Sequence, residues 1–359
     1  MLVDAILRKG SYPFFGLPTM NDELNEFLYR HGLAARGAPI AWTPLPGGVA
    51  SDIWRVDAPP RTLCVKRALG KLKVAADWQV STTRNAYEWA WIRYASLHAP
   101  GSVPAPLAYD AAFGMFAMEF LDPAAYPNWK QLLLQGTADS GTAAAVAKLL
   151  AQLHGASADD AGVAAAFQTS EIFFAIRLEP YLLATAQRHP DISDRLHALA
   201  DRTAAARIAL VHGDVSPKNI LIGPNGPVFL DAECAWFGDP AFDAAFCLNQ
   251  LLLKCLARPG STGAYLDCFA AFSDTYLSEV TWESSAGLEG RTASLLPALL
   301  LARVDGKSPV EYVTNEAAKA LVRATARPLI VAAPTRLMAI AEAWHAALKR
   351  NPGVAGAGM

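Results

Sequence analysis

Residues 211–221 read VHGDVSPKNIL, and shortly afterwards residues 230–243 read LDAECAWFGDPAFD. Together they place a His-Gly-Asp run, an asparagine five residues after that aspartate, and a second acidic pair beside apolar, strand-like segments. Acidic side chains in apolar surroundings are costly unless a charged partner meets them. A magnesium–nucleotide complex is such a partner, and it requires that the rest of the chain supplies the other parts of a phosphoryl-transfer site.

The first of these stretches carries the candidate catalytic base and the second the candidate metal ligands. Asp214 follows a predicted strand and is placed on a loop, where it can accept the proton of an acceptor hydroxyl. Asn219 offers an amide oxygen to a metal. Residues 219–231 predict a hairpin with its turn at residues 225–226, which returns Asp231 beside Asn219 as the main metal ligand. Strand alternation puts Glu233 on the same face as Asp231, within reach of the metal directly or through water.

Neighbouring polar residues are expected to support this loop. We expect His212 to hold the loop by hydrogen bonding rather than to transfer protons. Lys218 either touches the γ-phosphate or is an ordinary exposed loop lysine. Asp239 is predicted to cap the helix that follows it. Asp243, in an otherwise apolar run, should be buried and paired with the backbone of the loop or with His212.

A glycine turn, a strand lysine and a helix glutamate precede the catalytic stretch. Gly47, Gly48 and Ser51 lie between two predicted strands, where free backbone amides can cradle phosphate oxygens, although a plain hairpin turn is an alternative. Lys66 on the next strand is a candidate phosphate contact, or a solvated lysine. Glu88 on the following helix is its natural ion-pair partner, and an ordinary exposed helix acid is the alternative.

The chain divides into a small strand-rich part and a larger helical part. Alternating and β-branched segments predict five strands and one helix before residue 121, and Ala- and Leu-rich helices follow it. Backbone groups from Glu119 to Leu121 can bind an adenine edge where the two parts join. The predicted divisions are an N-terminal extension with one helix, a small lobe, a helical lobe and a tail: residues 1–39, 40–121, 122–350 and 351–359.

Composition limits the classes of partner and compartment. The 359 residues are 53% hydrophobic with a formal net charge of -2, so the chain has no general attraction for nucleic acid or an anionic membrane. No apolar run is long enough to span a bilayer. The five cysteines are an odd set without a Cys-x-x-Cys pair, which predicts buried thiols in a reduced, cytoplasmic protein.

In order, the glycine turn, Lys66, Glu88 and the motifs HGDVSPKN and LDAECAWFGDPAFD resemble the aminoglycoside phosphotransferase/choline kinase family, small-molecule relatives of the protein kinases. The resemblance covers roughly residues 45–254. It implies an α+β, bilobal, protein-kinase-like fold with a small antiparallel sheet and a helical C-lobe. It also implies ATP, Mg²⁺ and transfer of the γ-phosphoryl group to a hydroxyl. The Asp-x-Glu pair at residues 231–233 is similar to the methylthioribose kinase branch, whose members usually lack the asparagine found at 219.

The resemblance implies that the C-terminal helices build the acceptor pocket, and the sequence leaves the acceptor open. The acids after residue 254 are scattered among basic residues, which disfavours a polycation. The predicted acceptor is a sugar- or amino-alcohol-like small molecule. Trp236 either flanks the acceptor or packs in the core, and Arg303 either lines the pocket or joins helices by ion pairs. Competing functions are a non-catalytic nucleotide-binding protein and an aminoglycoside-modifying resistance kinase. A protein kinase is disfavoured because the activation-segment signature is missing.

Overall fold

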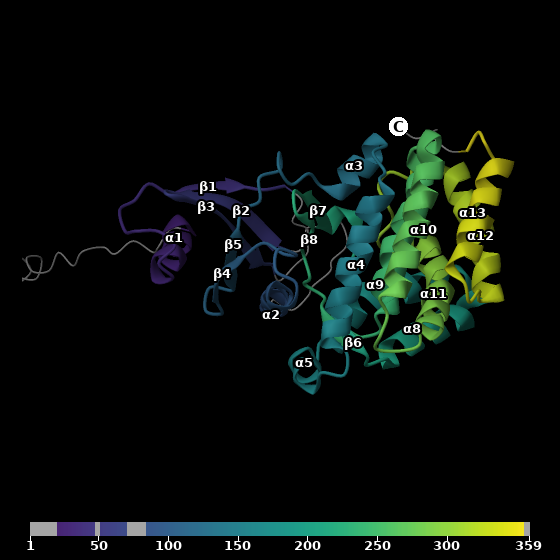
Figure 1. The fold of residues 1–359 in the computed structure, drawn as a ribbon, viewed down its shortest axis with the longest axis horizontal. Helices are drawn as coiled ribbons and strands as arrows, with labels where there is room; N and C mark the ends of the chain where they lie inside the picture. Colours follow the sequence, from purple (N-terminus) through teal and green to yellow (C-terminus); the bar gives the residue numbers. More distant parts are fainter. Residues whose placement is uncertain (1–19, 47–50, 70–83, 355–359) are drawn as a thin grey trace, which may run out of the picture.

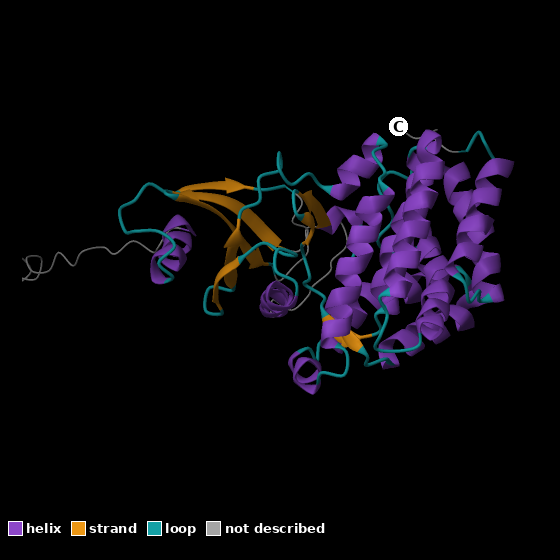
Figure 2. Ribbon diagram, viewed as in Figure 1, coloured by secondary structure: helices purple, strands orange, loops and turns teal. Residues whose placement is uncertain are grey.

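The computed structural model describes residues 20–46, 51–69 and 84–354, and it has two lobes that lie side by side (Figure 1). The lobe at the left of the view is built around an antiparallel sheet, and the lobe at the right is almost entirely helical (Figure 2). The predicted α+β, bilobal architecture is therefore confirmed.

The small lobe is a five-stranded antiparallel sheet with two helices, of which α1 precedes the first strand and α2 lies between β3 and β4 in the chain. Its strands run in the spatial order β1-β2-β3-β5-β4. In β2 alternate side chains are buried, which matches the apolar–polar alternation of its sequence. The elements are α1 (Met20–Arg30), β1 (Ala41–Pro44), β2 (Ser51–Ala58), β3 (Arg61–Ala68), α2 (Arg84–His98), β4 (Pro106–Asp110) and β5 (Met115–Glu119).

Helix α1 belongs to the core of the small lobe, although the sequence divisions set it apart with the N-terminal extension. Its apolar face, formed by Leu24, Phe27 and Leu28, is in one buried cluster with Trp54 and Val65 of the sheet. The spacing of these three side chains along the helix puts them on one face, so burial against the sheet is what holds the helix.

The large lobe packs its helices around α9, all of whose residues are buried. Its helices are α3 (Trp129–Gln135), α4 (Ser140–Ser157), α5 (Ala161–Ala166), α6 (Ser170–Phe173), a π-helical segment η1 (Phe174–Leu183), α7 (Ala184–Arg188), α8 (Ser193–Ala205), α9 (Ala241–Ala257), α10 (Thr262–Ser278), α11 (Ser285–Asp305), α12 (Glu316–Ala332) and α13 (Leu337–Arg350). Short 3₁₀ turns are η2 (Pro190–Ile192), η3 (Pro217–Asn219) and η4 (Pro259–Ser261).

Two small ribbons interrupt these helices and carry the motifs. Strands β7 (Ile220–Gly223) and β8 (Gly226–Phe229) form the predicted hairpin, but its turn is Pro224–Asn225, one residue earlier than predicted. Pro224 fits the first central position of a turn because its φ is fixed and it has no N–H to donate. In the second ribbon, β6 (Ala209–Val211) is the strand predicted before the catalytic loop, but β9 (Trp236–Gly238) and its pairing with β6 were not predicted. It ties the segment before the catalytic loop to the segment after the acidic pair.

All five cysteines are free and buried, as predicted (Cys64, Cys234, Cys247, Cys255 and Cys268). Within the described ranges, none of the helices combines the length and the apolar character needed to cross a membrane.

Candidate active site

The catalytic loop, which joins β6 to η3, is anchored by a buried aspartate from α9. The Asp243 carboxylate accepts the backbone N–H groups of His212 (2.7 Å) and Gly213 (2.8 Å). The His212 ring accepts the Asp214 N–H at Nδ1 (3.1 Å), so Nε2 carries the proton and donates to the Leu230 carbonyl (3.1 Å). Burial lowers the pKa of His212, which keeps the ring neutral. The predicted structural roles of His212 and Asp243 are confirmed.

Gly213 is required at this position for two reasons. Its φ is +78°, in the left-handed region, and a Cβ atom there would lie 2.8 Å from the Cys234 carbonyl oxygen. The close approach lets the loop pass directly under the segment that carries Asp231 and Glu233.

Asp214 is a buried carboxylate held by two cations. Its Oδ2 lies 2.9 Å from Arg177 Nη2 and 2.9 Å from Lys218 Nζ. Burial alone would raise the pKa of Asp214, but the charges of Arg177 and Lys218 outweigh it and keep this pKa below its usual value. The carboxylate is therefore ionised and fixed in orientation.

The sequence analysis did not identify Arg177 as a site residue, although its position in an apolar run indicated a buried partner. It lies in η1, in the apolar run FFAIRLEPYLL, where an isolated arginine must find a buried partner. Besides Asp214 it reaches the loop backbone, since its Nε donates to the Gly213 carbonyl at 2.5 Å. Arg177 therefore fixes both the backbone and the side chain at the predicted base.

The predicted metal ligands lie next to one another. Asn219 Nδ2 donates to the Asp214 carbonyl (3.1 Å), and the Asn219 carbonyl accepts the N–H of Leu230, the neighbour of Asp231 (2.9 Å). Asp231 has a φ of +67°, which is uncommon for a residue with a side chain and frequent at functional sites. Glu233 is held by Arg84, whose Nε donates to its Oε2 at 2.9 Å.

These oxygens fit magnesium better than a softer metal. The side-chain amide of Asn219 is oriented by the hydrogen bond that its Nδ2 donates, so its side-chain oxygen Oδ1 remains for a metal. Within the described residues, no three His, Cys, Asp or Glu side chains are grouped as a ready-made metal cage. Mg²⁺ usually takes few protein ligands and keeps water and phosphate oxygens for its remaining positions, so an Asn219–Asp231 pair is compatible with it.

Lys66 connects the two lobes. Its Nζ lies 2.7 Å from Glu88 Oε1, and both side chains are buried, which confirms the predicted ion pair. The same Nζ donates to Asp231 Oδ1 in the large lobe. Burial opposes the charge of Lys66, but the charges of Asp231 and Glu88 outweigh it and raise its pKa.

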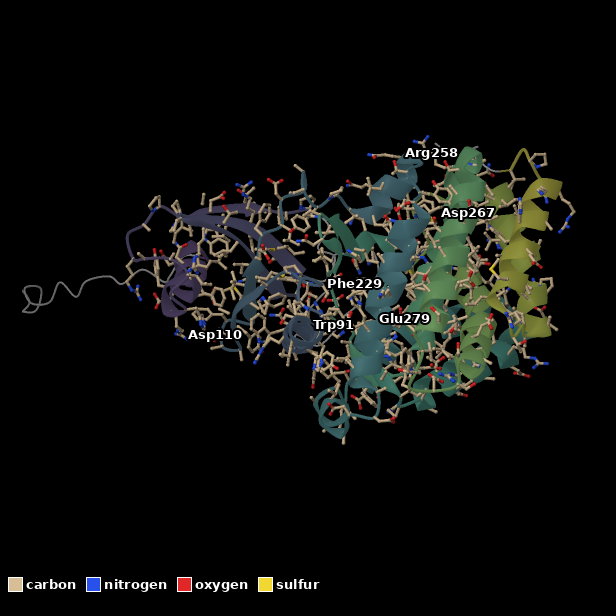
Figure 3. The ribbon with its side chains drawn as sticks, viewed as in Figure 1. Trp91, Asp110, Phe229, Arg258, Asp267 and Glu279 are labelled. Carbon is tan, nitrogen blue, oxygen red and sulfur yellow. The ribbon has the colours of Figure 1, made fainter. Side chains whose placement is uncertain are left out.

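Aromatic packing adds to this contact between lobes. Trp91 of α2 packs edge-on against His212 of the catalytic loop at 4.7 Å between ring centroids, and against Phe229 of β8 at 6.4 Å. Figure 3 shows Trp91 and Phe229 close together where the lobes meet. Helix α2, which carries Glu88, is thereby packed on the motifs of the large lobe.

The remaining predicted nucleotide contacts are only partly placed. Gly47 and Gly48 lie outside the described residues, and Ser51 is the buried first residue of β2. The Glu119 N–H is already bonded to the Ala105 carbonyl (2.9 Å). Leu121 is half-buried just after β5.

A cavity of about 190 Å³ lies beside Asp214 and Lys218, between the catalytic loop and helices α3, α9 and α11. Arg303 lines this cavity. Trp236 is fully buried and stacked on Phe173 at 4.2 Å, so the packing alternative describes Trp236.

Comparison with known proteins agrees with this geometry. The model of the APH phosphotransferase enzyme family matches residues 41–271. The chain belongs to this family. It is 26% identical over 258 residues to a methylthioribose kinase of Escherichia coli O45:K1 (strain S88 / ExPEC), a match that covers 62% of the chain and 60% of that relative.

Two solved structures are among those to which the chain is similar. One is a choline/ethanolamine kinase family protein from Mesorhizobium loti, with a TM-score of 0.49 and 15% identity over 93% of this chain and 100% of that one. The other is a spectinomycin phosphotransferase in complex with ADP and spectinomycin, with a TM-score of 0.47 and 14% identity over 90% of this chain and 98% of that one.

Proposed function

We propose that this protein is an ATP- and Mg²⁺-dependent phosphotransferase that moves the γ-phosphoryl group of ATP to a hydroxyl of a small molecule. The observation that carries the proposal is the meeting of an ionised, buried Asp214 with Asn219 and with the Lys66–Asp231 contact. Base, metal ligands and phosphate-binding lysine are the parts that phosphoryl transfer needs.

Asp214 is the base in this proposal. Both of its ion pairs use Oδ2, so Oδ1 is available to accept a hydrogen bond from the acceptor hydroxyl. The hydroxyl oxygen forms a bond to the γ-phosphorus, the bond from that phosphorus to the β–γ bridging oxygen breaks, and ADP leaves. The hydroxyl proton passes to Asp214. Its depressed pKa makes Asp214 a weak base, which suits a loose transition state in which orientation matters more than basicity.

The nucleotide is assigned to the space between the lobes. Lys66, held by Glu88, would contact the α- and β-phosphates, and Lys218 the γ-phosphate. Asn219 and Asp231, with Glu233 next to them, would hold Mg²⁺, which when bound neutralises phosphate charge. The remaining assignments are the glycine turn with Ser51 over the phosphates, and the backbone from Glu119 to Leu121 at the adenine edge.

We place the protein in the cytoplasm. Five buried free thiols suit a reducing compartment, where ATP and Mg²⁺ are also abundant.

The test is ATP turnover with a panel of sugars, amino alcohols, hydroxy acids and aminoglycosides, with the phosphorylated product detected by mass. Asp214→Asn keeps the side-chain shape and removes the base, so turnover should fall by about 10²- to 10⁴-fold. Nucleotide binding should persist, since the proposal gives Asp214 no nucleotide contact.

Asp267→Asn is the matched control, because Asp267 is an exposed acid on α10 away from the loop. It should retain wild-type turnover. If Asp214→Asn phosphorylated its acceptors as fast as the Asp267→Asn protein, Asp214 would not be the base. If the wild-type protein phosphorylated no member of the panel, the proposed function would be wrong.

A further inference from the structure

The cavity beside Asp214, which the proposed function makes the acceptor cavity, is lined by an unequal number of basic and acidic side chains. Three basic side chains line it, Lys130, Lys218 and Arg303, against two acidic ones, Asp214 and Glu311. Both acids are already paired: Asp214 with Lys218 and Arg177, and Glu311 with Lys130. Among the residues that the structure describes, Arg303 forms no ion pair with any carboxylate.

The guanidinium of Arg303 is hydrogen-bonded to the described residues at one nitrogen only, and its carbon lies 5.7 Å from the centroid of the Tyr181 ring. Nη1 donates to the Tyr181 hydroxyl (3.1 Å), the Ser308 carbonyl (2.5 Å) and the Ser308 hydroxyl (3.0 Å). Nε is buried without a hydrogen-bond partner, and no described residue accepts from Nη2. The Nη1 contacts are enough to close the end of α11. A purely structural role therefore does not explain why Nε and Nη2 are left without a hydrogen-bond acceptor.

A second unpaired cation lies behind the same wall. Lys254 of α9 is fully buried, and its Nζ donates to the hydroxyl of Tyr312, a cavity-lining residue, at 2.8 Å. The Tyr312 hydroxyl in turn donates to Gln250 Oε1 at 3.1 Å. In the described part of the chain Lys254 also lacks a carboxylate partner, so the side chain beneath this wall adds no negative charge to offset Arg303.

We propose that the acceptor is a compact hydroxylated anion whose anionic group binds Arg303 while its hydroxyl lies at Asp214. Guanidinium groups bind carboxylate and phosphate strongly because their N–H groups match the geometry of these anions. A cavity of about 190 Å³ suits a molecule smaller than the usual drug-sized ligand. A cationic acceptor would find both carboxylates paired and would meet Arg303 directly.

This inference rests on the proposed function for its account of the hydroxyl, but the anion site can be measured without turnover. The probes are matched pairs, glycerate with glycerol and gluconate with glucitol, plus glycerol 3-phosphate as the phosphate arm and choline as the cationic arm. Calorimetric binding is measured for each probe with and without Mg–ADP. The anionic members should bind about 10- to 150-fold more tightly than their neutral partners, the range for hydrogen bonds to charged groups.

The variants separate an anion contact from a structural role. Arg303→Gln should remove the preference for the anion, while Arg303→Lys, which keeps the charge, should restore part of it. Arg327→Gln is the control, since Arg327 is a half-exposed arginine of α12 that pairs with Asp191 outside the cavity. It should keep the full preference. The melting temperature of each variant, measured without probe, reports any loss of folding separately.

Three results would overturn the proposal: equal binding within each pair, tightest binding of choline, or an anion preference that survives in Arg303→Gln. Comparing glycerate with glycerol 3-phosphate tells which anion the site takes. Failure of the proposed function has a different signature, namely an Arg303-dependent anion preference with no acceptor phosphorylated.

Discussion

Lys254 gives a prediction that needs neither substrate nor nucleotide. Its ammonium lies fully buried in α9 against the Tyr312 ring, 4.0 Å from the ring centroid, and it has no carboxylate partner among the described residues. Burial lowers the pKa of Lys254 to about 7, and the charges of Lys130 and Arg303 act in the same direction, while Glu311 opposes them. An unfolded lysine has its ordinary pKa near 10.4.

The sign of the effect follows from proton binding. Between about pH 7 and pH 10 the unfolded state binds the proton that the folded state lacks, so the free energy of unfolding rises with pH. Integrated from pH 7 to pH 9, the gain is roughly 2 kcal/mol, at 1.36 kcal/mol for each unit of pKa difference.

Lys254→Met removes the titrating group and keeps most of its volume. We therefore expect the variant to gain stability over the wild type at pH 7, and this advantage to shrink by about 2 kcal/mol by pH 9. Urea unfolding followed by far-UV circular dichroism, which reports mainly on the helical lobe, measures the difference at pH 6, 7, 8 and 9. Other titrating groups cancel in that difference. A difference that stays constant over this range, or grows with pH, would refute the reasoning.

Three further predictions concern the proposed nucleotide and base residues. Asp231→Ala should abolish the magnesium-dependent part of ATP binding, measured by calorimetry with and without the metal; equal affinity in both conditions for the wild type would contradict a metal role. Lys66→Ala should weaken ATP binding. Glu88→Gln should weaken it less, because this variant keeps the Lys66 ammonium but removes the carboxylate that holds it. Titration with a fluorescent nucleotide measures both affinities, and an unchanged affinity in Lys66→Ala would exclude the phosphate contact. Arg177→Gln should move the acid limb of the pH–rate profile upward by about 1 to 3 units, since the cation that depresses the pKa of Asp214 is lost; an unmoved limb would show that Asp214 does not govern it.

The parts of this structure that could be predicted from sequence are those encoded by local patterns. Alternation in β2 and the spacing of apolar residues in α1 are readable because a strand or helix must bury one face. The pairing of Lys66 with Glu88 was predictable because a lysine on a buried strand needs a carboxylate nearby. The burial of Asp243 followed from the same reasoning about an acid in an apolar run.

The parts that were missed depend on contacts between distant segments. Strand β9 has three residues and no alternation, and only its pairing with β6 makes it a strand. The environments of Trp236 and Arg303 are set by how helix α6, the π-helical segment η1 and helix α11 pack. Phe173 covers Trp236, and Tyr181 and Ser308 aim the guanidinium of Arg303. Phe173 is far from Trp236 in the sequence and Tyr181 is far from Arg303, so no local window shows these contacts, and Ser308 alone lies near its partner in the sequence.

Arg303 and Lys254, the two basic side chains at the cavity that have no carboxylate partner among the described residues, respond differently to burial. A buried ammonium can release its proton, and the lowered pKa of Lys254 shows this route. An arginine guanidinium keeps its proton at any ordinary pH, so the charge of Arg303 remains whether or not a ligand is present. Polar neighbours satisfy Nη1, but the cost of leaving Nε without a partner persists until something accepts from the guanidinium. A fixed charge at the surface of the cavity attracts an anion from solution, which is the group that the proposed acceptor carries.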